Sequence, residues 1–242
     1  MKNIILIAIA ASFLFACNNS SVSNSSDKNA VGIETYKKLY TRSMELKDYS
    51  TAIMAIQMML VQDSGLVAYQ DSLPELYAAM NNVEAVSKTI DPVLKRHPKE
   101  EKFLQVKSIV QQELGDYDGV LKTFTTLYEI TNKLSYKYQI GTMHFQAGNL
   151  EEASKVVDEV LAKAPNSHDS LDIFVSEQQK QKVPILAAAL NFKGYIFAQK
   201  RNLAEAKNFF ESAIKVFPDF VMAKRNLQQI MQGPAQAQQR RP

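Results

Sequence analysis

The sequence predicts an all-α fold: an array of about five helix-turn-helix units followed by one further helix. The first observation is composition, because 46% of the 242 residues are hydrophobic while Trp is absent and Gly counts only 8, which suits helices and gives no sign of a sheet. The second is a turn followed by a helix start that recurs along the chain. The third is the spacing of these turns, about 34 residues, a period that marks repeat architectures.

Ahead of the array lies a leader that we expect to be outside the fold. Lys2 gives it a positive start, residues 4–16 are apolar, and the small Ala16 precedes Cys17, the single cysteine of the chain. This is the layout of a secretory signal. A retained transmembrane anchor is the less favoured alternative, because a spanning helix needs about 20 apolar residues.

The residues Leu14-Phe15-Ala16-Cys17 resemble the lipobox of bacterial lipoproteins, with an aliphatic residue three before the cysteine and a small one just before it. The resemblance implies removal of a signal peptide at 1–16, diacylglycerol on the Cys17 thiol and an acylated Cys17 amine. Several acyl chains on one residue would hold the protein stably at a bilayer. The alternative is an ordinary secretory signal with an incidental cysteine. A lipidated Cys17 leaves no thiol for a disulfide, so the domain must rely on its hydrophobic core.

The segments on either side of the array are polar. Residues 17–32 are expected to form the lipidated cysteine and a flexible Ser/Asn-rich tether, and residues 233–242 a disordered tail. The net charge is +3, with Lys2 part of the leader, so nucleic-acid binding gains no support. Asn18 replaces the Asp that retains some Gram-negative lipoproteins in the inner membrane, which favours an outer-membrane location facing the periplasm.

The clearest unit contains the stretch "IGTMHFQAGNLEEASKVVDEVLAKAP". Gly141 lets one helix approach its neighbour, and Gly148 ends that helix in a conformation that Gly adopts at little cost. Asn149 is expected to cap the next helix. Ala153 is small where the two helices cross, and Pro165 ends the second helix because it has no N–H to donate.

This pattern resembles the tetratricopeptide repeat (TPR), a unit of about 34 residues with the signature W-x₂-L-G-x₂-Y, A-x₃-F and a terminal Pro. The same frame recurs in "LNFKGYIFAQKRNLAEAKNFFESAIKVFP". Seven of its residues fall on signature positions: Leu190, Gly194, Phe197, Ala206, Phe210, Ala213 and Pro218. The resemblance implies a right-handed superhelical solenoid in which the first helices of successive units line a concave groove.

Three earlier turns, "KDYSTA", "NNVEAV" and "GDYDGV", extend this frame upstream. They place unit starts at Ile33, Val67, Glu101 and Leu134, separated by 34, 34 and 33 residues. The TPR domain is therefore predicted over 33–232, with units at 33–66, 67–100, 101–133, 134–167 and 187–220 and a capping helix at 221–232.

An insert of 19 residues, 168–186, separates the fourth and fifth units. Leu171, Phe174 and Val175 stand at helical spacing and predict a short amphipathic helix, residues 180–182 a polar turn, and Pro184 the first turn of the next helix. Insertions in repeat arrays tend to map to one face, often a binding face. The alternative is a tolerated surface excursion.

The residues that could carry chemistry form no catalytic or metal-binding pattern. His97, His144 and His168 lie in different parts of the repeat, without a paired cysteine or HExxH spacing, so a zinc site is unsupported. Ser212 and Lys215 spell S-x-x-K but are expected on a solvated helix face. We therefore expect a protein that is not an enzyme and that carries no metal or cofactor.

In the TPR family the second, fifth, ninth and twelfth positions of each unit line the groove, which typically binds peptides or protein segments. Among these positions are eight candidate contact residues: Lys37, Lys102, Gln105, Tyr138, Thr142, Phe145, Asn191 and Tyr195. Amides and aromatic faces suit an extended peptide, although packing between helices is the alternative for each aromatic. Members that clamp a C-terminal carboxylate use a Lys and Asn pair in the first unit, whereas Thr41 accompanies Lys37 here.

The anchor and the repeats together predict a non-catalytic, membrane-anchored TPR scaffold or adaptor of the bacterial cell envelope. It would bind a protein or peptide partner in its groove and serve assembly or secretion. The alternative is an envelope receptor for a small molecule or glycan fragment. Against that alternative stand the short chain and the absence of Trp, the favoured platform for sugars.

Overall fold

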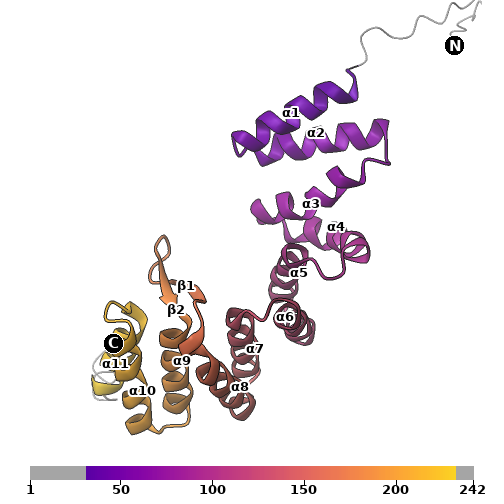
Figure 1. Cartoon of the computed structure of the whole chain (residues 1–242). Helices are drawn as coiled ribbons and strands as arrows, with labels where there is room; N and C mark the ends of the chain where they lie inside the picture. The colour runs from indigo at the N-terminus through magenta and orange to yellow at the C-terminus, as the bar shows by residue number, and fades with distance from the viewer. Residues whose placement is uncertain (1–30, 233–242) are drawn as a thin grey trace, which may run out of the picture.

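The structure, a computed structural model, describes residues 31–232. The leader, the predicted lipidation site Cys17, most of the predicted tether and the predicted tail therefore lie outside the described residues. Within them, eleven α-helices and one two-stranded β-hairpin follow one another along an elongated, curved array (Figure 1).

Ten of these helices form five pairs, each joined by a three-residue turn. The pairs are α1 (Ile33–Glu45) with α2 (Tyr49–Gln62), α3 (Val67–Ala79) with α4 (Val83–Arg96), α5 (Glu101–Glu113) with α6 (Tyr117–Thr131), α7 (Leu134–Gln146) with α8 (Leu150–Lys163), and α9 (Ile185–Gln199) with α10 (Leu203–Val216). A last helix, α11 (Val221–Gln232), follows the fifth pair. The predicted helical-repeat fold with a closing helix is confirmed.

The turn inside every pair places one residue in the left-handed region of backbone conformation. These five residues are Lys47 (φ 57°), Asn81 (φ 54°), Gly115 (φ 69°), Gly148 (φ 78°) and Arg201 (φ 60°). Only two of them are Gly. Such a residue ends the first helix by turning the chain back on itself. Since ordinary side chains adopt this conformation at a cost, the packing of the two helices must hold Lys47 and Arg201 there.

The residue after each left-handed position is the N-cap of the second helix. The side chains of Asp48, Asn82, Asp116 and Asn202 each accept a hydrogen bond from the backbone N–H three residues on. Asn149 occupies the same position, but its side chain makes no such bond. The sequence therefore predicts the start of α8 correctly, but the capping hydrogen bond expected from Asn149 does not form.

Small residues lie where paired helices cross. Ala153, Ala206 and Ala213 are fully buried. At Gly141 an added Cβ would lie 3.3 Å from Val157 Cγ2, whereas at Gly194 it would lie 2.7 Å from Cε1 of Phe210. The ring of Phe210 thus fills the space that the missing side chain of Gly194 leaves.

The hydrophobic core has no single centre and runs along the array as a series of clusters between neighbouring helices. Ile56 and Met59 belong to the cluster of the first units, and Leu127 and Val157 belong to clusters further along, all of them fully buried. Each pair buries its apolar faces against the next pair, which is how repeat proteins hold together. Pro165 lies in a 3₁₀ turn (Ala164–Asn166) after α8, and Pro218 follows the end of α10.

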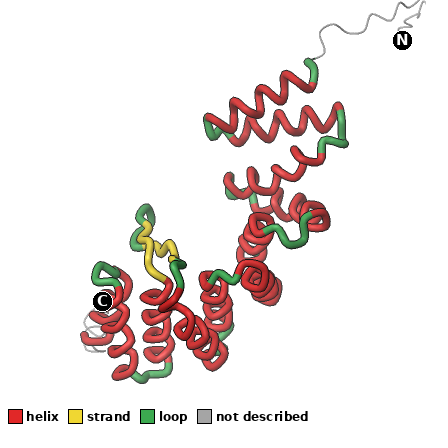
Figure 2. The backbone as a smooth tube through the Cα atoms, in the orientation of Figure 1, coloured by secondary structure: helices red, strands yellow, loops and turns green. Residues whose placement is uncertain are grey.

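The prediction for the insert is wrong, because it forms strands instead of a helix. β1 (Ser170–Phe174) pairs antiparallel with β2 (Lys180–Pro184), and this hairpin precedes α9 directly (Figure 2). Partly buried Leu171 and Ile173 alternate with exposed Asp172 and Phe174, the two-residue period of a strand. The predicted polar turn at 180–182 lies within β2. Pro184 ends that strand and is also the N-cap of α9, one residue before the predicted first turn.

The hairpin is fastened to the closing helix α11. The Gln181 side chain donates to the Asp219 carbonyl (2.6 Å) and accepts from the backbone N–H of Val221 (3.1 Å), the first residue of α11. Arg225 of α11 donates to the carbonyl of Val175 in the hairpin turn (2.9 Å). Insert and closing helix therefore cover the last pair together.

Candidate functional site

The predicted contact residues lie on the first helices of four units: Lys37 on α1, Lys102 and Gln105 on α5, Tyr138, Thr142 and Phe145 on α7, and Asn191 and Tyr195 on α9. The structure divides them by their contacts. The three aromatic residues on α7 and α9 belong to a shared set of rings, whereas the other five have polar partners of their own.

Four rings of α7 and α9 form a continuous set, here called the aromatic cluster: Tyr138, Phe145, Phe192 and Tyr195. Ring centroids are 5.3 Å apart between Tyr138 and Phe192, 5.6 Å between Phe145 and Phe192, and 5.3 Å between Phe145 and Tyr195. Phe192 is 6% exposed and contacts Tyr138 and Phe145, while Tyr195 is 39% exposed and faces solvent. The sequence does not single out Phe192, because its position in the repeat is not a groove position.

Tyr138 lies at the end of the aromatic cluster opposite Tyr195. It is half-buried and packs against Phe192, and like Leu171 of the hairpin it borders the buried core around α9. Burial raises the pKa of its hydroxyl above the usual range, so the group stays a neutral donor and acceptor at physiological pH. One turn further along α7, the hydroxyl of Thr142 donates to the carbonyl of Gln139 (2.7 Å), within its own helix.

Asn191 lies deeper than a contact residue of an open groove would. It is 7% exposed, and its side-chain oxygen accepts a hydrogen bond from the Asn226 amide of α11 (2.9 Å). A buried amide needs such a partner. Asn191 therefore joins the closing helix to α9 beside the aromatic cluster.

Gln105 belongs to a hydrogen-bond network between α5 and α7. Its amide donates to the hydroxyl of Tyr136, which in turn donates to the carboxylate of Glu101, and Lys133 Nζ lies 2.6 Å from the same carboxylate. Hydrogen bonds from Lys133 and Tyr136 lower the pKa of Glu101. The pKa of Tyr136 is raised to about 12, mainly by burial and secondly by the hydrogen bond to Glu101. The network ties the two helices together and uses the polar groups of Gln105.

The two predicted groove lysines also have partners. Lys102 Nζ lies 3.0 Å from the Glu75 carboxylate of α3, and 4.5 Å from the ring centroid of Phe103. Lys37 Nζ lies 2.7 Å from Glu34 within α1. A ligand carboxylate would have to compete with these acidic side chains for either lysine.

Asp71, at the fifth position of the second unit, lies in a cluster that the sequence does not indicate. Its carboxylate accepts from Arg96 and lies 2.8 Å from His97 Nε2, and both partners come from the C-terminal end of α4. Burial alone would raise the pKa of Asp71, but the hydrogen bonds from Arg96 and His97 outweigh burial and hold the pKa below its ordinary value. These contacts join α3 to α4.

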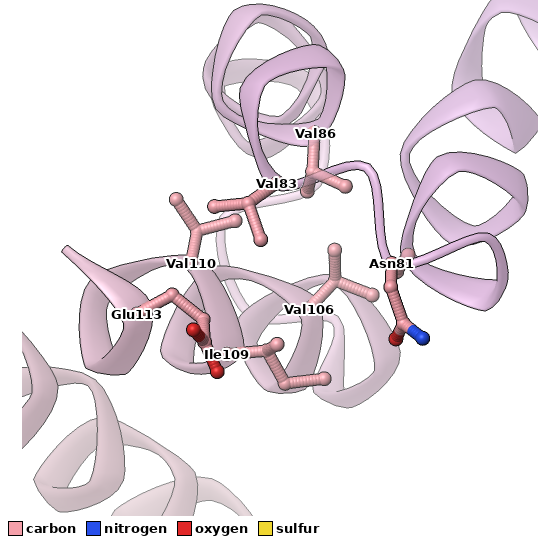
Figure 3. Close-up of a pocket in the computed structure, with 8 residues that line it drawn as sticks. Asn81, Val83, Val86, Val106, Ile109, Val110 and Glu113 are labelled. Carbon is pink, nitrogen blue, oxygen red and sulfur yellow. The ribbon is translucent and has the colours of Figure 1, made fainter.

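A pocket of about 160 Å³ lies between the turn after α3, the start of α4, and α5. In Figure 3, valines from α4 face valines from α5 across it, and Asn81 and Glu113 lie at its edges. Its lining is Ala78, Asn81, Val83, Val86, Val106, Ile109, Val110 and Glu113. An apolar cavity of comparable size admits benzene, so the pocket suits one apolar side chain.

This pocket adjoins the predicted groove. Ala78 is the twelfth residue of the second unit and Ile109 the ninth of the third, so both stand at groove positions of the repeat. Ile109 is 49% exposed although it is a large apolar residue. The groove therefore offers an apolar recess on its N-terminal half and aromatic rings on its C-terminal half.

The described residues give no metal-binding group and no helix long and apolar enough to cross a membrane. The hydroxyl of Ser212 donates to the carbonyl of Asn208 (2.8 Å), one turn back on an exposed face of α10. This bond places Ser212 in the role of a surface helix residue, as expected.

Comparison with known proteins adds to this picture. A family model for the tetratricopeptide repeat matches residues 187–220, the predicted fifth unit. The fold is that of a tetratricopeptide-repeat protein. No curated protein matches the sequence of this chain.

Several solved structures resemble the TPR array at low sequence identity. MamA from Desulfovibrio magneticus RS-1 is 12% identical with a TM-score of 0.59, covering 78% of this chain and 96% of that chain. YrrB, described as a TPR protein with an unusual peptide-binding site, is 17% identical with a TM-score of 0.58, covering 80% and 91%. Another MamA structure is 12% identical with a TM-score of 0.58, covering 76% and 90%. At such identities the likeness shows the fold.

Proposed function

We propose that this protein is a non-catalytic TPR scaffold that binds an extended segment of a partner protein in its groove, and that lipid on Cys17 holds it in the bacterial envelope. The observation that carries the binding proposal is the aromatic cluster of α7 and α9. Its rings meet edge to face or tilted, which fixes them without a ligand, and Tyr195 leaves a ring exposed to receive one.

Rigid aromatic faces bind a peptide at a low cost in side-chain entropy, since they have few rotamers to lose. An extended peptide would lay side chains over Tyr195 and Phe145, and the neutral hydroxyl of Tyr138 could exchange hydrogen bonds with its backbone. The apolar pocket beside Ile109 would take a further side chain of the same ligand. The peptide-binding site described for YrrB, which has a similar fold, supports this class of ligand.

The charges of the groove favour an internal segment of the partner over its C-terminus. Both groove lysines, Lys37 and Lys102, already contact carboxylates of this chain. Capture of a terminal carboxylate would require those pairs to open. A ligand recognised mainly through apolar side chains and backbone groups leaves both ion pairs intact.

The groove proposal is tested by crosslinking in intact envelopes, affinity purification of the tethered protein, and mass spectrometry. Tyr195→Ala, and the double variant Tyr138→Ala/Tyr195→Ala, should lower recovery of the partner about tenfold, which corresponds to roughly 1.4 kcal/mol. Tyr117→Ala is the matched control, because this tyrosine is 54% exposed at the start of α6, away from the aromatic cluster. Equal recovery from the wild type and a correctly folded Tyr195→Ala variant, as judged by circular dichroism, would refute the proposal.

The anchor is tested separately by cell fractionation. Cys17→Ser removes the acceptor for lipid and should move the protein from the membrane fraction to the soluble fraction. Separation of inner from outer membranes then locates the wild-type protein, which we expect in the outer membrane. A Cys17→Ser protein that still sediments with membranes would show that something other than lipid on this residue holds it there.

A further inference from the structure

The outer face of α2 is apolar and exposed. Met54, Met58 and Val61 have exposed fractions of 52%, 43% and 83%. They are spaced by four and three residues, so they share one face of the helix. The whole helix, YSTAIMAIQMMLVQ, carries no charged side chain. We refer to these three residues as the α2 face.

The other units provide an internal comparison, because the second helix begins at the same position of the repeat in all five. The residues equivalent to the α2 face include at least one charged side chain in every other unit. They are Lys88, Pro92 and Lys95 on α4; Lys122, Thr126 and Glu129 on α6; Lys155, Glu159 and Ala162 on α8; and Asn208, Ser212 and Lys215 on α10. The apolar surface is therefore a property of the first unit and not of the repeat.

The first unit is also where the N-terminal segment enters. The side-chain amide of Gln62 donates to the carbonyl of Val31 (3.0 Å), so the chain arrives at the C-terminal end of α2, next to Val61. Val31 lies only 14 residues after Cys17 in the sequence. A fully extended chain of that length reaches about 50 Å at most. Lipid on Cys17 would thus confine the α2 face to the neighbourhood of a bilayer.

We propose that the α2 face rests on the bilayer that holds Cys17, an inference that depends on the proposed lipid anchor. A helix without charges can enter the interfacial region without desolvating an ion. The equivalent face of α6, with Lys122 and Glu129, could not do so at the same depth. Since the tether already supplies proximity, three apolar side chains suffice to bias orientation. The contact places a second helix against the lipid and leaves the first helices, which carry the groove positions, open to a partner.

The test uses the full-length lipidated protein in phosphatidylethanolamine/phosphatidylglycerol vesicles. Cys17 is the chain's single cysteine and would be occupied by lipid, so one introduced cysteine can be labelled selectively. An environment-sensitive fluorophore at Met54→Cys is compared with the same label at Lys122→Cys, the equivalent residue of α6. Lipid-borne quenchers should reduce the Met54→Cys signal about twofold more than the Lys122→Cys signal, because an interfacial face lies ~5–10 Å into the lipid boundary.

The outcomes separate this inference from the anchor. Protein that fails to float with the vesicles contradicts the lipid anchor. Protein that floats with equal quenching at both positions overturns the α2 contact alone. The soluble double variant Cys17→Ser/Met54→Cys serves as a third arm: a blue shift that grows with protein concentration, in the absence of lipid, would assign the α2 face to a second copy and overturn the bilayer proposal.

Discussion

Gly141 and Gly194 stand at the same position of two successive units, yet the same substitution should destabilise the protein only at Gly194. In Gly194→Ala the new Cβ would lie 2.7 and 2.8 Å from two carbons of the Phe210 ring and 3.1 Å from the Ala206 carbonyl oxygen. In Gly141→Ala the nearest atoms are 3.3 Å away on Val157 and 3.5 Å away on Phe192 and Val156, close to ordinary van der Waals distance. Gly194→Ala therefore requires α9 and α10 to move apart, whereas Gly141→Ala places no comparable strain between α7 and α8.

The expected magnitudes follow from two opposing effects. Replacing Gly by Ala inside a helix gains about 1 kcal/mol of helix propensity. Overpacking a well-packed site costs about 1–3 kcal/mol, and Phe210, which is 1% exposed, has no room to withdraw. We expect Gly194→Ala to lower the free energy of unfolding by about 1 kcal/mol, and Gly141→Ala to leave it unchanged or raise it by up to about 1 kcal/mol.

The assay is urea unfolding followed by circular dichroism, with amide hydrogen exchange to assign the effect to particular helices, because repeat arrays can unfold in parts. Adding Phe210→Leu to Gly194→Ala should reveal a favourable coupling of about 0.5 kcal/mol or more, since the smaller side chain vacates the contested space. Equal effects of the two glycine substitutions, or no coupling with Phe210→Leu, would refute the packing explanation.

Three further predictions concern the polar contacts. Tyr136→Phe should lower the free energy of unfolding by about 1–2 kcal/mol. The folded-state pKa of Tyr136 is raised from 10.0 to about 12, so the stability that this hydroxyl contributes is lost as pH rises through that range. In alkaline unfolding experiments the wild type should therefore show this loss and Tyr136→Phe should not. The pKa of Asp71 is lowered instead, so its contribution is complete above about pH 4 and lost as pH falls through the folded-state pKa, and Asp71→Asn should flatten the acid side of the stability profile. Gln181→Ala should remove about 1–2 kcal/mol and speed hydrogen exchange at the start of α11, while Lys182→Ala on the exposed face of the same strand should leave both unchanged.

The units of the fold could be predicted because their signals are local. Gly148 and the N-cap residues mark turns through backbone conformation and side-chain capping, which depend on neighbours in sequence. The structure of the insert could not be predicted, because its apolar residues fit both the helical and the strand period. Leu171, Phe174 and Val175 suit a helix, while Leu171 and Ile173 suit a strand. Contacts distant in sequence, chiefly Gln181 with α11, favour the strand.

The candidate site could likewise be predicted from the sequence only in part. Tyr138, Phe145 and Tyr195 could be placed on one surface from the repeat period alone, because equivalent positions of a solenoid face the same side. Phe192 and the pocket beside Ile109 depend on how closely one unit packs against the next. The partners that occupy Lys102 and Gln105 likewise come from other units, and no local pattern reveals them.

The hairpin also restricts how this array can change length in evolution. In a repeat protein each unit contacts its neighbours, so duplication or loss of a whole unit usually leaves the remaining contacts intact. Such an event before Leu134 would preserve every contact between the hairpin and α11. The same event between β2 and α11 would separate Gln181 from Val221 and expose the last pair. Gain and loss of units are therefore expected in the N-terminal half of natural variants, with the segment from 168 to 232 inherited as a block.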